Sequence, residues 1–142
     1  MSLQQIVDRH YREVNSNDYS DVAEVFSADV VTHVPGVGAL TGIEPFVAYG
    51  QGFHRAFPDG RIHGDRYVES GDVIVVEGRF TGTNTGPLDT PTGRLSATGR
   101  PLILPFADLF RVADGKIAEH RLYFDTVAML SQLGLMPEPT PA

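Results

Sequence analysis

The chain has 142 residues, a mass of 15.4 kDa, a formal net charge of −7 and no cysteine. With 42% hydrophobic and 20% charged residues it can bury one globular core, and we expect one domain over residues 1–135. The negative charge disfavours nucleic acids and anionic membranes as partners, because both attract basic faces. Disulfides and thiolate metal sites are excluded, and no apolar run reaches the ~20 residues that span a bilayer, so we expect a cytoplasmic protein.

Helical periodicity marks the first part of the chain. Ser2 and Gln5 have the spacing of a capping box, and apolar residues then recur at helical intervals. Thr41 and Glu44 repeat the pattern, and the glycine-containing segment 36–42 is interpreted as a turn. The predicted elements are helices over 3–15, 19–26 and 43–57, and a strand over 29–34.

The second part of the chain alternates between strand patterns and turns. Segment 82–100, rich in Gly, Thr and Pro, predicts a long hairpin connection in which 95–98 begins the next strand. The predicted elements are strands over 61–69, 73–83, 102–112 and 116–124, a helix over 127–133 and a disordered tail over 136–142. Helices followed by strands indicate an α+β fold, in which one curved antiparallel sheet packs on N-terminal helices as a cone and leaves a pocket.

Two carboxylates stand out near the C-terminal end of this pattern. Asp108 shares one face of its strand with residues that are otherwise apolar: Leu102, Leu104, Phe106, Phe110 and Val112. A carboxylate on a buried face needs a partner, such as His120 or Arg121, or a raised pKa. Asp125 follows the neighbouring predicted strand, so both acids approach one sheet.

Five motifs resemble the SnoaL-like polyketide cyclase family, within the nuclear-transport-factor-2-like superfamily. They are AFPD (56–59), GTNTGPL (82–88), PTGR (91–94), FRVADGKIAEH (110–120) and FDTVAMLSQLG (124–134). The resemblance implies a cofactor-free enzyme with a cone-shaped α+β fold that acts on aromatic polyketides, often as a homodimer or homotetramer. Its acid/base aspartate matches Asp125, and an aspartate of the related ketosteroid isomerases matches Asp108. The chain departs from related sequences at Asn84, where histidine is frequent, and at Leu122, where others carry an acid.

The candidate catalytic residues are therefore Asp125, Asp108 and His33. A carboxyl group in an apolar cavity can exchange protons near neutral pH because desolvation raises its pKa. Each candidate also has a structural interpretation: Asp125 could cap the last helix, Asp108 could form a buried pair, and His33 could be a core histidine bonded to the backbone. The candidate substrate-binding residues are Tyr123, Arg121, Phe53, Phe106 and Phe110.

The leading hypothesis is a cofactor-independent enzyme that cyclises an aromatic polyketide by an intramolecular aldol addition. The alternatives are a hydroxylase or epoxide-hydrolase-like enzyme that uses the same pocket, and a non-catalytic binding or dimerisation module. The five histidines show no metal-binding spacing such as HExxH, so no metal and no cofactor is expected. The expected partner is a hydrophobic aromatic small molecule.

Overall fold

The computed structural model describes residues 1–136, so of the predicted tail over 136–142 only Met136 falls within the described part. The helices are α1 (Leu3–Ser16), α2 (Val22–Val25), α3 (Ile43–Ala56) and α4 (Thr126–Gln132). The strands are β1 (Phe26–Val34), β2 (Gly38–Thr41), β3 (Arg61–Ser70), β4 (Val73–Thr83), β5 (Leu88–Thr90), β6 (Gly93–Leu95), β7 (Pro101–Ala113) and β8 (Lys116–Phe124). No helix within residues 1–136 is both long enough and apolar enough to cross a membrane.

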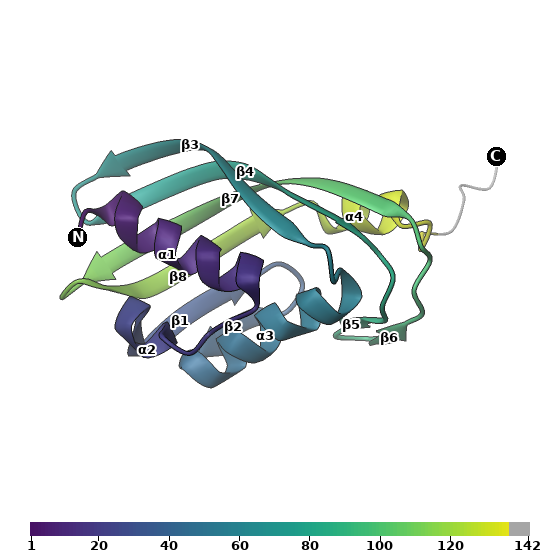
Figure 1. The fold of residues 1–142 in the computed structure, drawn as a ribbon, viewed down its shortest axis with the longest axis horizontal. Helices are drawn as coiled ribbons and strands as arrows, with labels where there is room; N and C mark the ends of the chain where they lie inside the picture. The colour runs from purple at the N-terminus through teal and green to yellow at the C-terminus, as the bar shows by residue number, and fades with distance from the viewer. Residues whose placement is uncertain (137–142) are drawn as a thin grey trace.

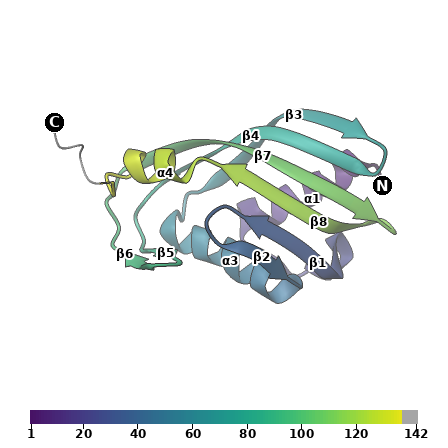
Figure 2. The same ribbon diagram turned by 180° about the vertical axis from the view of Figure 1, so that it is seen from behind.

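A curved sheet in the order β2-β1-β8-β7-β4-β3 forms the body of the molecule. Helices α1 and α3 lie on the same side of it (Figure 1), and the view from behind shows the sheet in front of both helices (Figure 2). The α+β class with a curved sheet on N-terminal helices is therefore confirmed. One pairing differs from the antiparallel prediction, because β1 runs parallel to β8.

The glycine-containing segment before α3 was predicted as a turn, and this prediction is wrong in part. Residues 38–41 form β2, which pairs antiparallel with β1 at the edge of the sheet. The capping box at Thr41 is also absent among the described contacts of α3, whose N-cap is Gly42 with φ 91°. A positive φ suits glycine, which explains why the helix begins there instead.

Two further boundaries differ from the prediction. The second helix is limited to Val22–Val25, and Phe26 already belongs to β1. In segment 82–100, β5 and β6 form a small separate hairpin, and the next sheet strand begins at Pro101 rather than at 95. The remaining helices and strands lie within a few residues of their predicted positions.

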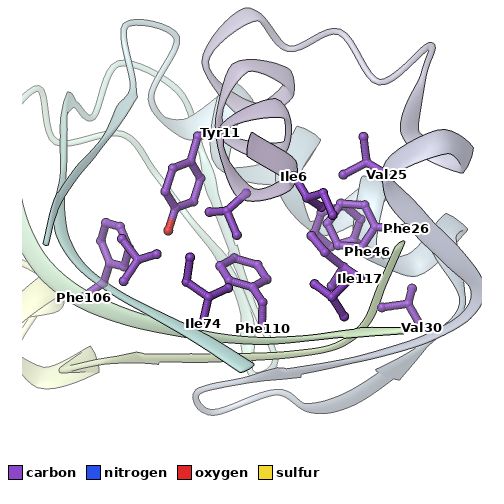
Figure 3. Close-up of a cluster of buried hydrophobic side chains, with 13 residues drawn as sticks. Ile6, Tyr11, Val25, Phe26, Val30, Phe46, Ile74, Phe106, Phe110 and Ile117 are labelled. Carbon is purple, nitrogen blue, oxygen red and sulfur yellow. The ribbon is translucent and has the colours of Figure 1, made fainter. Parts of the chain in front are cut away.

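The core lies between the helices and the covered face of the sheet. Ser2 completes its capping box with Gln5 at the start of α1, whose apolar face turns toward the strands. Tyr11 and Ile6 of α1 point toward side chains of the sheet such as Phe106, Phe110 and Ile117 (Figure 3). Fully burying such side chains contributes about 1.5–3 kcal/mol each, so this interface accounts for much of the stability.

Asn84 holds the long connection between β4 and β7 in place. Its side chain is 0% exposed; Nδ2 donates to the carbonyls of Gly86 (2.9 Å) and Ala56 (3.3 Å). Oδ1 accepts from the backbone N–H of Thr98 over 2.8 Å. The amide therefore ties both ends of the connection to the end of α3, which is a structural reason for asparagine at this position.

Replacing Asn84 with Ala should lower the free energy of unfolding by about 2–4 kcal/mol, because buried donors and acceptors lose their partners. Urea denaturation monitored by circular dichroism measures the change. Thr85→Ala is the matched control, since Thr85 is exposed and should change stability by less than about 0.5 kcal/mol. Equal stability of the two variants would contradict the role assigned to Asn84.

Candidate active site

A cavity of about 90 Å³ lies between α1, α3 and the face of the sheet that they cover. Aromatic and aliphatic side chains make up most of its wall, among them Phe46 and Phe53 of α3 and Phe106 of β7. The polar or titratable residues on the wall are His10, Tyr19, Thr32, Tyr49, Asp108 and His120. An apolar hollow with a few converging polar groups is the usual form of a small-molecule site.

Asp108 is the buried acid of this wall, at 2% exposure. The hydroxyl of Tyr11, on α1, donates to Oδ2 over 2.8 Å, and Nε2 of His120, on β8, lies 2.8 Å from Oδ1. When the carboxylate is ionised, Nε2 carries the ring proton and donates it to Oδ1. Two hydrogen bonds from two different elements thus offset the cost of burying this charge.

The ring of His120 is fixed in orientation by its neighbours. Phe110 pairs with His120 across β7 and β8 and stacks on the ring, with centroids 4.4 Å apart and planes 14° from parallel. The ring of His10 lies 5.6 Å from that of His120. Burial, and then the nearby His120, lowers the pKa of His10 well below its ordinary value, so His10 is neutral at pH 7.

Two phenol groups near Asp108 keep their protons at neutral pH. Burial is the main cause that raises the pKa of Tyr11, followed by the charge of Asp108 and the hydrogen bond to it. Burial, and then Asp108, also raises the pKa of Tyr49 on the cavity wall. Tyr49 on the cavity wall therefore keeps its phenolic proton and can donate a hydrogen bond.

The structure brings four of the predicted site residues to the cavity or directly behind it. Asp108, Phe53 and Phe106 line the wall. Phe110 lies behind it in the core at 0% exposure, where it supports the ring of His120. The roles predicted for these residues in catalysis and binding stay predictions.

The other predicted site residues lie elsewhere. His33 of β1 is the register partner of Arg121 of β8, and Arg121 is the partner of Leu109 of β7. These three residues each follow an inward-facing neighbour, namely Thr32, His120 and Asp108. Their side chains therefore point to the outer face of the sheet. Tyr123 lies on the same outer face and is 54% exposed. This register places the candidates His33, Arg121 and Tyr123 away from the cavity that Asp108 lines, and their functional roles stay predictions.

Asp125 is the N-cap of α4, an exposed position outside the cavity. Its Oδ1 accepts from the backbone N–H of Ala128 over 3.0 Å. This is the helix-capping arrangement that the sequence also allowed, and it corrects the expectation that Asp125 points into the pocket. The catalytic role that the resemblance implies for Asp125 stays a prediction, without support from this position.

Five polar residues at the site were not among the sequence candidates: His10, Tyr11, Tyr19, Thr32 and Tyr49. The sequence suggested His120 only as a structural partner of Asp108, and the structure contains that pair. His10 and Tyr11 belong to the predicted apolar face of α1, where a polar atom at the tip of a ring is hard to distinguish from packing. Thr32 alternates with Val30 and Val34, and this apolar side of β1 was the available signal that Thr32, not His33, points inward.

A comparison with models of protein families shows to which family the chain belongs. The model of the SnoaL-like polyketide cyclase family matches residues 5–133. The chain belongs to this family. No protein of curated function matches it.

Solved structures of the SnoaL-like type share the fold over almost the whole chain. A candidate SnoaL-like polyketide cyclase from Jannaschia sp. CCS1 has a TM-score of 0.82 at 25% identity, covering 94% of this chain and 92% of its own. IdmH, a candidate polyketide cyclase from Streptomyces antibioticus, has a TM-score of 0.78 at 27% identity, covering 92% and 97%. AclR, a candidate hydroxylase from Streptomyces galilaeus, has a TM-score of 0.77 at 20% identity, covering 95% and 86%, and shares the fold alone.

Two further predictions concern metals and oligomers. Residues 1–136 contain no group of three or more His, Asp or Glu side chains placed to hold a metal ion. The outer face of the sheet exposes apolar side chains, including Val68 (53%) and Ile103 (60%). The homodimer or homotetramer stays a prediction, as does the cytoplasmic location.

A second buried acid lies outside the cavity, beside a polar hollow of about 180 Å³ at the end of α1. Glu13 is 8% exposed, and within residues 1–136 neither of its carboxylate oxygens has a hydrogen-bond partner. Burial is the largest cause that raises the pKa of Glu13 to about 7, with Arg9 opposing it and Asp21 and Asp18 adding to it. The folded protein therefore binds a proton at Glu13 that the unfolded chain releases near pH 4.5.

Stability should fall as the pH rises from about 4.5 to about 7, because over this range the folded state holds more protons than the unfolded state. Replacing Glu13 with Gln should remove this slope and raise the free energy of unfolding at pH 8 by about 1–2 kcal/mol. Urea denaturation at pH 5 and pH 8 measures both effects, with the exposed Glu69→Gln as control. A Glu13→Gln variant that kept the wild-type slope would contradict this account.

Proposed function

We propose that the protein is a cofactor-independent enzyme that closes a ring of an aromatic polyketide by intramolecular aldol addition. The observation that carries the proposal is the pair of Asp108 and His120, buried in the wall of an apolar cavity. Membership of the SnoaL-like polyketide cyclase family supports the substrate class.

An aldol ring closure requires few groups from the protein. One group must take a proton from the carbon next to a carbonyl, or from the O–H of the corresponding enol, and donors must stabilise the oxygen on which negative charge then develops. In this proposal the Asp108–His120 pair accepts that proton and returns it to the alkoxide oxygen that ring closure forms. Its position behind an apolar wall keeps water away, which strengthens its electrostatic effect on a bound substrate.

The hydroxyl groups of Tyr49 and Tyr19 are the proposed donors to the developing oxyanion. Both residues line the cavity. Burial raises the pKa of Tyr19 to about 12, with Glu13 as the second cause, and Tyr49 is shifted in the same direction. Each phenol therefore stays protonated throughout the reaction and can donate to the oxygen. Phe53 and Phe106 provide flat apolar surfaces for an aromatic substrate.

Replacing Asp108 with Asn should lower kcat on an aromatic polyketide precursor by at least about 100-fold, the usual contribution of a general acid or base. Turnover of a panel of anthracycline-like precursors, followed by mass spectrometry, is the measurement, with near-ultraviolet circular dichroism to verify the fold. A ring closure by aldol addition leaves the substrate mass unchanged, apart from loss of water, whereas a hydroxylation adds an oxygen atom.

The variant Asp125→Asn tests which of the two aspartates, Asp108 or Asp125, is required for catalysis. Asn is as good an N-cap as Asp, so this variant should keep the helix, the stability and the activity. Loss of turnover in Asp125→Asn together with full turnover in Asp108→Asn would reverse the assignment. A product heavier by one oxygen would favour the hydroxylase alternative instead.

A further inference from the structure

Three polar atoms around the cavity have no hydrogen-bond partner within the described part of the chain. They are Nδ1 of His10, Nδ1 of His120 and Oγ1 of Thr32. Their residues are 3%, 4% and 1% exposed, and all three line the cavity. A buried polar atom without a partner costs about 1–3 kcal/mol, so three of them on one wall require an explanation.

These three residues come from different elements and line the same cavity. Thr32 of β1 and His120 of β8 are partners in the register of the parallel pair, so their side chains lie side by side on the inner face. His10 of α1 approaches from the opposite side, with its ring 5.6 Å from that of His120. Around them lie the aromatic rings of Phe26, Phe46 and Phe110.

The hydrogen-bonding capacity of the cluster is well defined. In a neutral His120 ring whose Nε2–H donates to the Asp108 carboxylate, Nδ1 holds a lone pair and can only accept. The hydroxyl of Thr32 can donate, and the neutral ring of His10 has one N–H to give. The cluster thus offers an acceptor on one strand, a donor on the next strand and a donor on the helix.

A hydroxyl group complements this arrangement better than other common ligand groups. It has one hydrogen to donate and two lone pairs with which to accept. A carbonyl oxygen has no hydrogen for Nδ1 of His120, and an ammonium group has no lone pair for Thr32 or His10. Either mismatch would leave part of the cluster buried without a partner.

We propose that His120, Thr32 and His10 form a subsite for a hydroxyl group of the ligand, a phenol or an enol, whose O–H donates to Nδ1 of His120. The oxygen of that group accepts from Oγ1 of Thr32 and from the ring of His10. The subsite rests on the proposed function in that it places an acidic O–H of the substrate next to the Asp108–His120 pair. Asp108 then acts as a positioning residue, because it binds the His120 ring at Nε2 and leaves Nδ1 free for the ligand, and Tyr11 holds the Asp108 carboxylate.

Phenol and toluene, which have almost the same shape, test the subsite without any turnover. Their dissociation constants are measured by isothermal titration calorimetry for the wild-type protein and for Thr32→Val, which removes the hydroxyl and keeps the shape. We expect Thr32→Val to bind phenol about tenfold more weakly, because one buried hydrogen bond is lost, and to bind toluene within about twofold of wild type. Thr41→Val, on the exposed edge strand β2, is the matched control and should change neither value.

Nitrogen-15 NMR supplies the second measurement. Phenol should shift the resonance of Nδ1 of His120 in the wild-type protein, whereas toluene should leave it near its ligand-free position. Unchanged phenol affinity in Thr32→Val, no phenol binding at millimolar concentration, or no change at Nδ1 would each overturn the proposal. The last of these results, no change at Nδ1, is expected if a water molecule occupies the cluster and phenol does not displace it.

The subsite and the proposed reaction can fail separately. Phenol binding needs no catalysis, so a failure of the phenol experiment with intact polyketide turnover would remove only the subsite. Full turnover by Asp108→Asn, with phenol binding as described here, would remove only the reaction.

Discussion

The carboxylate of Asp108 is the constraint on which the arrangement of the molecule depends. Its burial would be prohibitive without Tyr11 and His120, and these partners come from α1 and β8, whereas Asp108 belongs to β7. Satisfying one charge therefore fixes the helix against the sheet and the register between two strands. Phe110 completes the arrangement, since it holds the ring of His120 by stacking. The Asp108 carboxylate, with both of its oxygens hydrogen-bonded, is held rigidly, as a group for proton transfer must be.

The two faces of the sheet carry different sets of side chains, because successive side chains along a strand point to opposite faces. The inner face carries Asp108, His120 and Thr32 next to an apolar cavity, and the outer face carries His33, Arg121 and Tyr123. A shift of register by one residue would exchange these sets and expose Asp108 to solvent. The chemistry of the SnoaL-like cavity is therefore linked to the same pairing that builds the core.

The strands and the longer helices could be predicted from local patterns, because a capping box and the alternation of apolar and polar residues each involve residues that are close in the sequence. Asp108 could be identified for the same reason, as the one charge on an apolar face. The parallel pairing of β1 with β8 joins residues about 90 positions apart along the sequence, and no local pattern indicates it. The choice of His33 over Thr32 overlooked a local signal instead, because Thr32 alternates with the apolar Val30 and Val34. Asp125 shows a different limit: an acid before a helix is compatible with both a cap and a catalyst, and only its exposed position separates the two.

The state of the His120 ring tests this account most directly. A long-range proton–nitrogen NMR correlation experiment on the wild-type protein near pH 7 shows which ring nitrogen carries the proton. The account predicts a neutral ring protonated at Nε2, with Nδ1 unprotonated, because Asp108 holds the proton on the Nε2 side. A ring protonated at Nδ1 alone would contradict it, because Asp108 would then have to carry the shared proton and Nδ1 could not accept one from a ligand.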